Sequence, residues 1–388
     1  MKQGWKIKKL KEICAKITDG THQTPKYFDE GVIFLSSKNV TSGKIDWDNI
    51  KYIDEKQHLE MHKRVAPRVG DILLAKNGTT GVAAMVDRDV VFDIYVSLAH
   101  IRVLEEVTPE FMLYFINSPI AKKQFNKRLK GSGVPNLHLE EIREVEILLP
   151  PLSEQQRIVA ILDEVFEAIA KAKANAEQNL KNAKELFESY LQKVFETKGE
   201  GWEEKNFEDC FKLKSGDVLT STNMSENGEY PVFGGNGIAG LHNNFNLSGS
   251  NIIIGRVGAL CGNVRHITEN IWLTDNAFKV VGLKFDYDHS FLTYLLNYKN
   301  LRSFARQAAQ PVISNSSLKN VALEFPKSLK EQQNIAQKLD VLLLETKKLE
   351  AIYKQKINDL EELKKSVLQK AFAGELKEDL KEHFAENA

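Results

Sequence analysis

The stretch SEQQRIVAILDEVFEAIAKAKANAEQNLKNAKELFESYLQKVF, residues 153 to 195, occurs twice in this chain. A shift of 177 positions places Glu154-Gln155-Gln156 on Glu331-Gln332-Gln333 and Phe195 on Phe372. Sixteen of the 42 aligned positions from 154 to 195 are identical, with no gap. Chance would give only a few identities, so we interpret the stretch as an internal duplication, and a repeat of this kind decides how the whole fold is interpreted.

Each copy has the residue spacing of a long helix. Apolar or small residues recur at steps of three and four from Ile158 to Val194, which is the seam of a coiled coil with one eleven-residue segment. The second copy keeps this register, with interruptions at Thr346 and Lys364. About 43 helical residues form a rod of roughly 65 Å. A rod this polar needs a partner, and the obvious partner is the other copy. The predicted pairing residues are Ile158, Leu162, Val165, Ile169, Leu180, Ile335, Leu339, Leu342, Leu349 and Leu360.

The sequence also marks the ends of both helices. Ser153-x-x-Gln156 and Ser328-x-x-Glu331 each follow proline and are typical of capping boxes, and Gly199 and Gly374 are expected to close the helices. Polar residues that the copies share are expected on an outward face that docks other subunits. In the first copy this face comprises Gln155, Gln156, Lys171, Gln178, Glu185 and Gln192.

The composition of the 388 residues restricts the class of protein. Lys and Arg total 53, as do Asp and Glu, so any phosphate contact must come from local clusters rather than bulk charge. Cys14, Cys210 and Cys261 are far apart without CxxC spacing, which is typical of reduced cytosolic thiols. The N-terminal sequence lacks a signal-peptide core, and no run approaches the ~18 apolar residues of a membrane helix. We expect a soluble, cytoplasmic protein that contacts no membrane.

The segments outside the rods also repeat a common plan. In residues 1–152, Val32–Leu35 and Ile72–Ala75 are typical of buried strands, and residues 109–130 of a helix that breaks at Asn117-Ser118-Pro119. A shift of 180 places residues 70–78 on residues 250–258.

The two globular halves differ in length. The shift is 197 at Trp5 and Trp202 but 180 later, so the second half is 17 residues shorter, and we place the loss between Gly216 and Ser250. The halves share a skeleton but little surface identity, as two readers of different targets would. We predict a duplicated α/β (α+β) fold in four segments: a globular half at 1–152, a helix at 153–198, a second half at 199–328, and a helix with a polar tail at 329–388.

No catalytic or metal-binding pattern stands out in the sequence. It contains no G-x-x-x-x-G-K-[ST] phosphate loop, no Asn-Pro-Pro-aromatic tetrapeptide and no H-E-x-x-H motif. His58 and His62 lie four residues apart, but a helical histidine pair without other ligands is more often a surface pair than a metal site. We therefore predict no catalytic residue and no metal ligand, and the pattern favours a binding or adaptor protein over an enzyme.

Three kinds of segment are candidates for nucleic-acid contact. A cation leaves a buried strand before a glycine in both halves, in Lys76-Asn77-Gly78 and in Arg256-Val257-Gly258, and Arg, Lys and Asn reach phosphates or base edges. Basic residues also cluster beside Gly131-Ser132-Gly133, and basic and aromatic residues alternate in residues 19–27. Surface cations, a solvated charged face and a plain surface loop are the alternative interpretations. The predicted contact residues are Lys76, Asn77, Thr79, Thr80, His22, Lys26, Lys122, Lys123, Lys127, Arg128, Arg256, Arg302 and Arg306.

The order globular–helix–globular–helix resembles the specificity subunit of a type I restriction–modification system. The resemblance rests on the junction Leu149-Pro150-Pro151-Leu152-Ser153-Glu154-Gln155-Gln156-Arg157-Ile158 and on its counterpart from Phe325-Pro326 to Ile335. The strand Gly-Asp-Ile-Leu-Leu-Ala-Lys-Asn-Gly and the opening Ile-Thr-Asp-Gly-Thr-His are also similar to that family. The resemblance covers essentially the whole chain, although Lys327-Ser328-Leu329 departs from the Pro-Pro-Leu pattern.

The resemblance implies that each globular half is a target-recognition domain for one half of a split double-stranded DNA sequence. It implies that the helices form an antiparallel coiled coil with pseudo-two-fold symmetry, set the half-site spacing, and dock two methyltransferase subunits, with two restriction subunits where the system has them. S-adenosylmethionine, and ATP with Mg²⁺ where a nuclease is present, would reside on these partners, so this chain holds no cofactor. Two alternatives remain open: an RNA-binding adaptor with a helical arm, and a coiled-coil scaffold that binds no nucleic acid.

Overall fold

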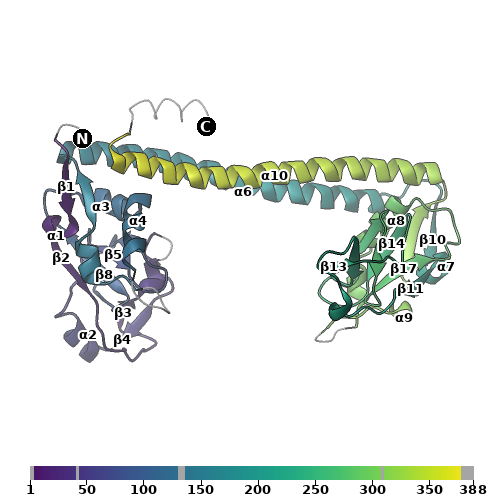
Figure 1. Cartoon of the computed structure of the whole chain (residues 1–388), viewed down its shortest axis with the longest axis horizontal. Coiled ribbons are helices and arrows are strands. Elements are labelled where there is room, and N and C mark those ends of the chain that lie inside the picture. The colour runs from purple at the N-terminus through teal and green to yellow at the C-terminus, as the bar shows by residue number, and fades with distance from the viewer. Residues whose placement is uncertain (1–3, 41–42, 130–135, 307–309, 377–388) are drawn as a thin grey trace. The chain divides into compact units, whose positions relative to one another are not determined.

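The computed structural model describes residues 4–40, 43–129, 136–306 and 310–376. The chain divides into two compact units (Figure 1). Unit 1 comprises Met1–Glu177 and Gln355–Ala388, and unit 2 comprises Gln178–Lys354. This division differs from the four predicted segments, because each unit combines one globular half with part of each long helix. The predicted polar tail at residues 377–388 lies outside the described residues.

The two predicted rods are continuous helices. Helix α6 spans Leu152–Glu196 and helix α10 spans Leu329–Ala373, each with 45 residues. Ser328 accepts a hydrogen bond from the backbone N–H of Glu331 (3.4 Å), as its capping pattern predicts. Ser153 instead lies inside the first turn of α6, because the N–H groups of Glu154 and Gln155 donate to the carbonyl of Pro151 (3.0 Å each).

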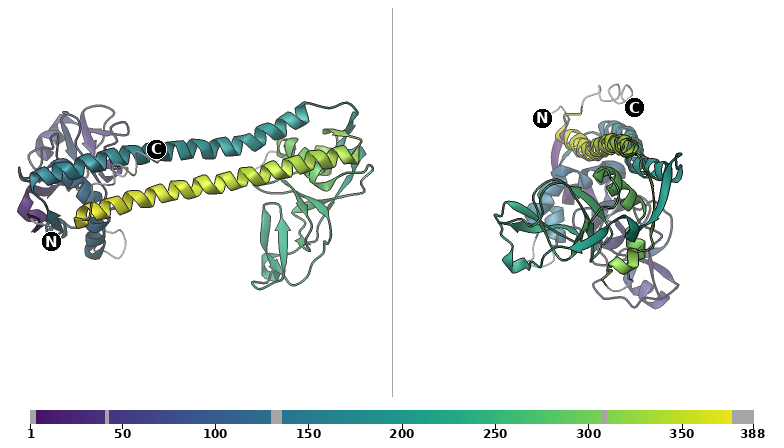
Figure 2. Two further views of the ribbon diagram at one scale, coloured as in Figure 1. Left: turned by 90° about the horizontal axis from the view of Figure 1, so that it is seen from above. Right: turned by 90° about the vertical axis from the view of Figure 1, so that its right-hand side faces the viewer.

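In unit 1 the first part of α6 lies antiparallel beside the last part of α10 (Figure 2). Ile158 shares a buried core with Phe372, whereas Lys173, further along α6, pairs with Glu361, which comes earlier in α10 (2.5 Å). The predicted residues of unit 1 bury the seam together. Ile158, Leu162, Val165 and Ile169 are buried, and Leu360 packs partly buried against them.

In unit 2 the end of α6 shares a buried core with the start of α10. Leu191 and Phe195 cluster with Leu339, and Ile335 packs partly buried against them. Leu180 and Leu342 are half-buried. Leu349 departs from the predicted seam, because its side chain is 37% exposed while Thr346 is buried and donates its hydroxyl proton to the helix backbone.

The globular half of unit 1 contains three sheets and short helices. Its sheets have the orders β1-β9, β2-β8-β5-β6 and β4-β3-β7. The strands are β1 (Lys6–Lys9), β2 (Cys14–Asp19), β3 (Val32–Leu35), β4 (Lys51–Ile53), β5 (Ile72–Ala75), β6 (Ala83–Met85), β7 (Phe92–Ile94), β8 (Leu98–Val103) and β9 (Glu146–Leu149). The helices are α1 (Leu10–Ile13), α2 (Glu55–Met61), α3 (Pro109–Asn117), α4 (Pro119–Arg128) and α5 (Leu139–Arg143), with a 3₁₀ turn η1 (Ser37–Val40). Helices α3 and α4 confirm the predicted break before Pro119, since proline cannot continue a helix hydrogen-bond ladder.

Unit 2 repeats this topology strand for strand. Its sheets have the orders β10-β18, β11-β17-β14-β15 and β13-β12-β16. The strands are β10 (Trp202–Asn206), β11 (Lys212–Ser215), β12 (Tyr230–Gly234), β13 (Gly237–His242), β14 (Asn251–Gly255), β15 (Val264–Ile267), β16 (Trp272–Leu273), β17 (Ala277–Val281) and β18 (Ala322–Pro326). The helices are α7 (Phe207–Cys210), α8 (His289–Tyr298) and α9 (Asn315–Leu318), with 3₁₀ turns η2 (Ser221–Asn223) and η3 (Leu301–Phe304). The predicted duplicated α/β fold is therefore confirmed.

The units differ between their corresponding strands. Residues 54–71, which join β4 to β5, include α2, whereas only residues 243–250 join β13 to β14 and form no helix. The shorter connection lies within the region where the sequence places the missing residues. Among the described helices, none combines the length and apolar character needed to span a bilayer.

Candidate nucleic-acid interface

A buried glutamine fastens the globular half of unit 1 to the start of α6. The Gln155 side chain is 0% exposed. Its amide nitrogen donates to the carbonyls of Glu106 (2.9 Å) and Pro150 (3.0 Å), and its amide oxygen accepts from the backbone N–H of Thr108 (2.9 Å). Because Thr108 is the N-cap of α3, this glutamine also fixes where α3 begins.

Gln332 makes the same three contacts in unit 2. It donates to the carbonyls of Asp286 (3.3 Å) and Pro326 (2.9 Å) and accepts from the N–H of Asp288 (2.9 Å), the N-cap of α8. The expectation that Gln155 and Gln332 face outward to dock other subunits is therefore wrong. Both are buried, and they hold a globular half in place.

Two further polar contacts are duplicated. The Tyr114 hydroxyl donates to the Asp163 carboxylate on α6, and the Tyr294 hydroxyl donates to Asp340 on α10. A shift of 180 relates the tyrosines, and a shift of 177 relates the aspartates. Burial raises the pKa of both tyrosines, and their carboxylate partners raise it further, so both hydroxyls stay protonated donors. These contacts place each globular half at the same position on its pair of helix segments.

In each unit an asparagine side chain also fixes a helix to the sheet, and a shift of 180 relates the two asparagines. Asn117 in α3 accepts from the N–H and donates to the carbonyl of Ala83 (3.0 Å each). Asn297 in α8 makes the same pair of bonds with Val264 (3.0 and 2.9 Å). The two units therefore share the same contacts within the globular half and between it and the helices. We call these contacts the frame: those of Gln155 and Gln332, Tyr114 and Tyr294, and Asn117 and Asn297.

The four-stranded sheet of each unit brings two strand ends together. In unit 1, β2 and β5 both pair antiparallel with β8, so they run in the same direction and end at the same edge. Asp19 ends β2 and Lys76 follows β5. In unit 2, β11 and β14 both pair with β17, Ser215 ends β11, and Arg256 follows β14. We call this region, around Asp19 and Lys76 or around Ser215 and Arg256, the strand-end edge.

In unit 1 the strand-end edge is a compact ion network. The buried Asp19 carboxylate contacts Lys76 (3.0 Å), Arg64 (2.5 Å) and His22 (3.2 Å). Burial raises the pKa of Asp19, but the hydrogen bonds from Arg64 and Lys76 outweigh it and hold the pKa below its ordinary value. The exposed Arg64 and His22 side chains surround this fixed negative charge, so the network presents oriented hydrogen-bond donors to solvent.

The sequence predicts Lys76 as a nucleic-acid contact, but the structure buries its side chain. Its side chain is only 5% exposed and its ammonium group is held by Asp19, so it cannot reach a phosphate or a base in this arrangement. Arg64 replaces it as the exposed cation. The sequence contains no signal for Arg64, because it meets Asp19 only after α2 folds against the sheet.

In unit 2 the strand-end edge has a different charge. The Arg256 guanidinium donates to the Ser215 hydroxyl (3.5 Å) and to the Asp275 carbonyl (3.3 Å), and it lies 5.3 Å from the centre of the Phe278 ring. Its Nε is buried without a hydrogen-bond partner. Among the described residues, no carboxylate neutralises Arg256, so this half-buried cation remains available for an anion or a base edge.

The loops that follow β5 and β14 each turn through a glycine. Gly78 has φ +75° and Gly258 has φ +104°, backbone conformations that residues other than glycine rarely adopt. Asn77 then pairs with Asn136 in an isolated bridge, as Val257 does with Val312. Thr79 is exposed and Thr80 is half-buried. The predicted Gly-Ser-Gly loop at 131–133 lies outside the described residues.

A second exposed patch in unit 1 combines cations with aromatic rings. The Lys51 ammonium lies 3.9 Å from the centre of the Tyr27 ring, and that of Lys26 lies 5.4 Å from the centre of the Phe28 ring. Tyr27 and Phe28 are both exposed. Lys26 and Tyr27 belong to the predicted stretch 19–27, whereas Phe28 and Lys51 lie outside it. Exposed rings of this kind can stack on bases.

The predicted lysine cluster on α4 faces α10 rather than the strand-end edge. Lys122, Lys123 and Lys127 line a cavity of about 560 Å³ together with Lys365. Burial lowers the pKa of Lys122, and Lys365 and Lys364 lower it further. Arg128 lies apart from this cavity, because it donates to the backbone carbonyls of Gln124 (3.2 Å) and Glu144 (3.4 Å).

The other predicted cations of unit 2 are exposed, with Arg302 in the 3₁₀ turn η3 and Arg306 just after it. Arg302 donates to the carbonyl of Ala259, in the loop after β14, and Arg306 pairs through its backbone with Val312. Both therefore lie beside the loop that carries Gly258. Their contact with nucleic acid stays a prediction.

Comparisons with known proteins agree with this architecture. A family described as "Type I restriction modification DNA specificity domain" matches residues 2–181 and 199–362. The chain is 30% identical over 198 residues to the EcoprrI specificity subunit of Escherichia coli, a match that covers 49% of this chain and 48% of that relative. The chain thus spans about half the length of this curated relative.

Two solved structures share the fold. A chain of a type I R-M system, studied for complex assembly and conformational transition, superposes with a TM-score of 0.77 at 21% identity, covering 96% of this chain and 99% of the other. The HsdS subunit from Thermoanaerobacter tengcongensis superposes with a TM-score of 0.61 at 21% identity, covering 97% and 98%. At this level of identity, these likenesses establish the fold.

Proposed function

This chain belongs to the family of type I restriction modification DNA specificity domains, and on that premise we propose that it is the DNA sequence-specificity subunit of a type I restriction–modification complex. Each globular half reads one half of a bipartite double-stranded DNA target. The chain is not itself an enzyme, and it holds neither S-adenosylmethionine nor ATP. Those cofactors reside on methyltransferase and restriction subunits that assemble with it.

One observation carries this proposal: the two units have the same frame but different strand-end edges. The buried glutamines, the tyrosine–aspartate pairs and the asparagines that fix a helix on the sheet are matched in both units. The strand-end edge instead carries Asp19, Arg64 and Lys76 in unit 1 and an unneutralised Arg256 in unit 2. A common scaffold with two different polar edges is what the reading of two different half-sites requires, because base edges are distinguished by donor and acceptor patterns.

Helices α6 and α10 supply the remaining parts of the proposed function. They set the distance between the half-sites, and their exposed polar faces, without Gln155 and Gln332, dock two methyltransferase subunits. The lysine-lined cavity beside α4 supplies positive charge next to this surface. A long continuous helix suits a spacer better than a flexible linker, because its length is fixed by its residue count.

The test is to express the chain with a methyltransferase subunit and to sequence the methylated sites. We expect a bipartite motif in which Arg64→Ala relaxes one half-site and Arg256→Ala relaxes the other. A lost base contact costs about 1–3 kcal/mol of discrimination, so the relaxed position should tolerate other bases about 10- to 100-fold more readily. Lys6→Ala is the control, because it removes one exposed positive charge from β1, outside the strand-end edge and outside the long helices.

Methylation that loses both half-sites equally in each arginine variant would contradict the assignment of one half-site to each unit. A continuous, undivided methylation motif would contradict the bipartite reading. Tight binding of structured RNA in place of duplex DNA would favour the alternative of an RNA-binding adaptor.

A further inference from the structure

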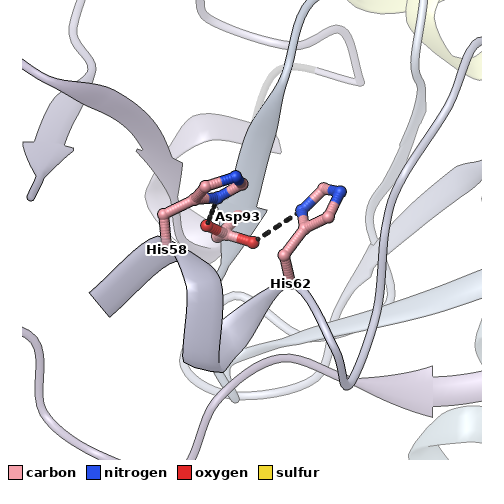
Figure 3. A group of neighbouring side chains, drawn as sticks. All are labelled: His58, His62 and Asp93. Atoms are coloured by element: carbon pink, nitrogen blue, oxygen red, sulfur yellow. Dashed lines mark hydrogen bonds and ion pairs between the residues drawn. The ribbon is translucent and has the colours of Figure 1, made fainter. Parts of the chain in front are cut away.

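In unit 1, His58 in helix α2, His62 at the C-terminal cap of this helix and Asp93 in strand β7 lie together (Figure 3). Nδ1 of His58 lies 2.7 Å from Oδ2 of Asp93, and Nδ1 of His62 lies 3.0 Å from Oδ1 of the same carboxylate. The i,i+4 spacing places both imidazoles on one side of the helix. One ligand atom from each of the three residues lies within 4.8 Å of the others.

The sequence alone leads to a different interpretation of this pair. It provides two histidines without a third ligand, and we therefore expected them on the surface. The structure adds Asp93, which is 31 residues beyond His62 and only 1% exposed. His58 is largely buried as well, and His62 is partly covered.

The charge around Asp93 distinguishes it from the other buried acids of unit 1. Among the described residues these acids are Asp19, Asp71 and Asp93. Asp19 contacts Lys76 and Arg64, and Asp71 contacts Arg102, so both have a permanently positive partner. Asp93 has only the two imidazoles in the described part of the chain. A buried carboxylate without a permanent countercharge is costly, and a divalent cation would supply the missing positive charge.

The ligand set also fits a particular class of metal ion. Two imidazole nitrogens and one carboxylate oxygen suit Zn²⁺, Co²⁺ or Ni²⁺ rather than Ca²⁺ or Mg²⁺, which prefer oxygen ligands. Metal–ligand bonds of about 2.1 Å in the tetrahedral geometry usual for Zn²⁺ place ligand atoms about 3.4 Å apart. One ligand atom from each residue lies within 4.8 Å of the others, so the three side chains need only draw together to surround one ion. Three protein ligands leave further positions for water.

We propose that His58, His62 and Asp93 form a binding site for a divalent transition-metal ion, with Zn²⁺ as its representative occupant. The ion fastens α2 to β7. Because Arg64 follows His62 by two residues and pairs with Asp19, the ion also orders the segment that supplies Arg64 to the strand-end edge. Unit 2 has no helix at the corresponding connection, so the site belongs to unit 1 alone.

The test uses the full chain, freed of metal with a chelator and titrated with Zn²⁺ by calorimetry and with Co²⁺ by absorption spectroscopy. We expect one tight equivalent per chain in the wild type. His58→Gln, His62→Gln and Asp93→Asn should each weaken binding by more than about 100-fold, since loss of an outer-shell partner alone weakens metal sites 10- to 100-fold. The matched control is His138→Gln, which removes an exposed histidine of the same unit and should leave binding unchanged.

A further variant separates metal ligation from a purely structural role. His62→Cys replaces one ligand with another, so it should retain Co²⁺ binding and gain a thiolate-to-cobalt charge-transfer band. Zn²⁺ should raise the melting temperature of the wild type and of His62→Cys but not of His62→Gln. Equal Zn²⁺ affinity in the wild type and in His62→Gln, or no charge-transfer band in His62→Cys, would overturn the proposal. Neither readout depends on DNA, so the proposed function and the metal site fail independently.

Discussion

Replacement of Gln155 by alanine should loosen unit 1, whereas the same replacement at its neighbour Gln156 should not. The two residues are adjacent and chemically identical, but Gln155 is 0% exposed and Gln156 is exposed. Both changes introduce the same gain in helix propensity, so Gln156→Ala is a control that differs only in tertiary contacts.

The magnitude follows from three hydrogen bonds that Gln155→Ala removes. The Thr108 N–H and the carbonyls of Glu106 and Pro150 would lose their partner in a buried setting. A typical bond contributes about 1 kcal/mol, and an unsatisfied buried group costs about 1–3 kcal/mol. We expect a loss of about 3 kcal/mol in the free energy of unfolding of unit 1. For a unit of this size, that corresponds to a decrease of roughly 6–12 °C in melting temperature.

The assay is hydrogen–deuterium exchange by mass spectrometry, because it reports on each unit separately. Gln155→Ala should accelerate exchange in α3 and in the sheet of unit 1, while peptides from unit 2 stay protected. Gln332→Ala should do the reverse, and the exposed Gln333 provides its matched control. If Gln155→Ala and Gln156→Ala differ by less than about 0.5 kcal/mol, the buried glutamine does not fasten the globular half, and the reasoning fails.

Three other outcomes follow from the same structure. Burial raises the pKa of Asp71, but hydrogen bonds from Arg102 and His100 hold it well below its ordinary value. The charged carboxylate therefore stabilises the fold above pH ~4, and this stabilisation is lost as acidification protonates it. In acid titrations, the difference in free energy of unfolding between wild type and Asp71→Asn should narrow below pH ~4. A constant difference would contradict this. Burial raises the pKa of Cys14 to about 12, so iodoacetamide at pH 8 should alkylate it about 10³-fold more slowly in the native than in the denatured chain, as peptide mass spectrometry would reveal. Insertion of seven helical residues after Glu177 and after Lys354 lengthens α6 and α10 by about 10 Å. Sequencing of the methylated DNA sites should then show a spacer between the half-sites that is about three base pairs longer, with both half-sites unchanged.

The sequence was sufficient to predict the helices because their information is periodic and local. Steps of three and four residues specify one face, and Ile158, Leu162, Val165 and Ile169 all lie in the buried seam. The same spacing could have identified the buried glutamine, since Gln155 lies three residues before Ile158 on that face. The prediction instead places Gln155 on the outward docking face with the other shared polar residues, although a polar residue on a seam can be buried where it meets free backbone groups.

The charged site was less predictable because its partners are distant in the sequence. Lys76 meets Asp19 only through strand pairing across β8, and Asp93 meets His58 only after α2 packs on β7. A cation at a strand end has the same local sequence whether it is exposed or neutralised. Its availability depends on the residue that ends a strand at least 40 positions earlier in the chain, which is Asp19 in unit 1 and Ser215 in unit 2.

The duplicated frame explains how the two halves can diverge without losing their function. Apolar packing between a globular half and its helices is not directional, so alone it would tolerate sliding along the seam. The Gln155 and Gln332 contacts, together with Tyr114 and Tyr294, are directional and fix the same helix positions in both units. Residues at the strand-end edge make none of these contacts, so they can change with little effect on the frame. This separation lets α2 exist in one unit only. Under the proposed function, it places the difference between the two half-sites at the strand-end edge.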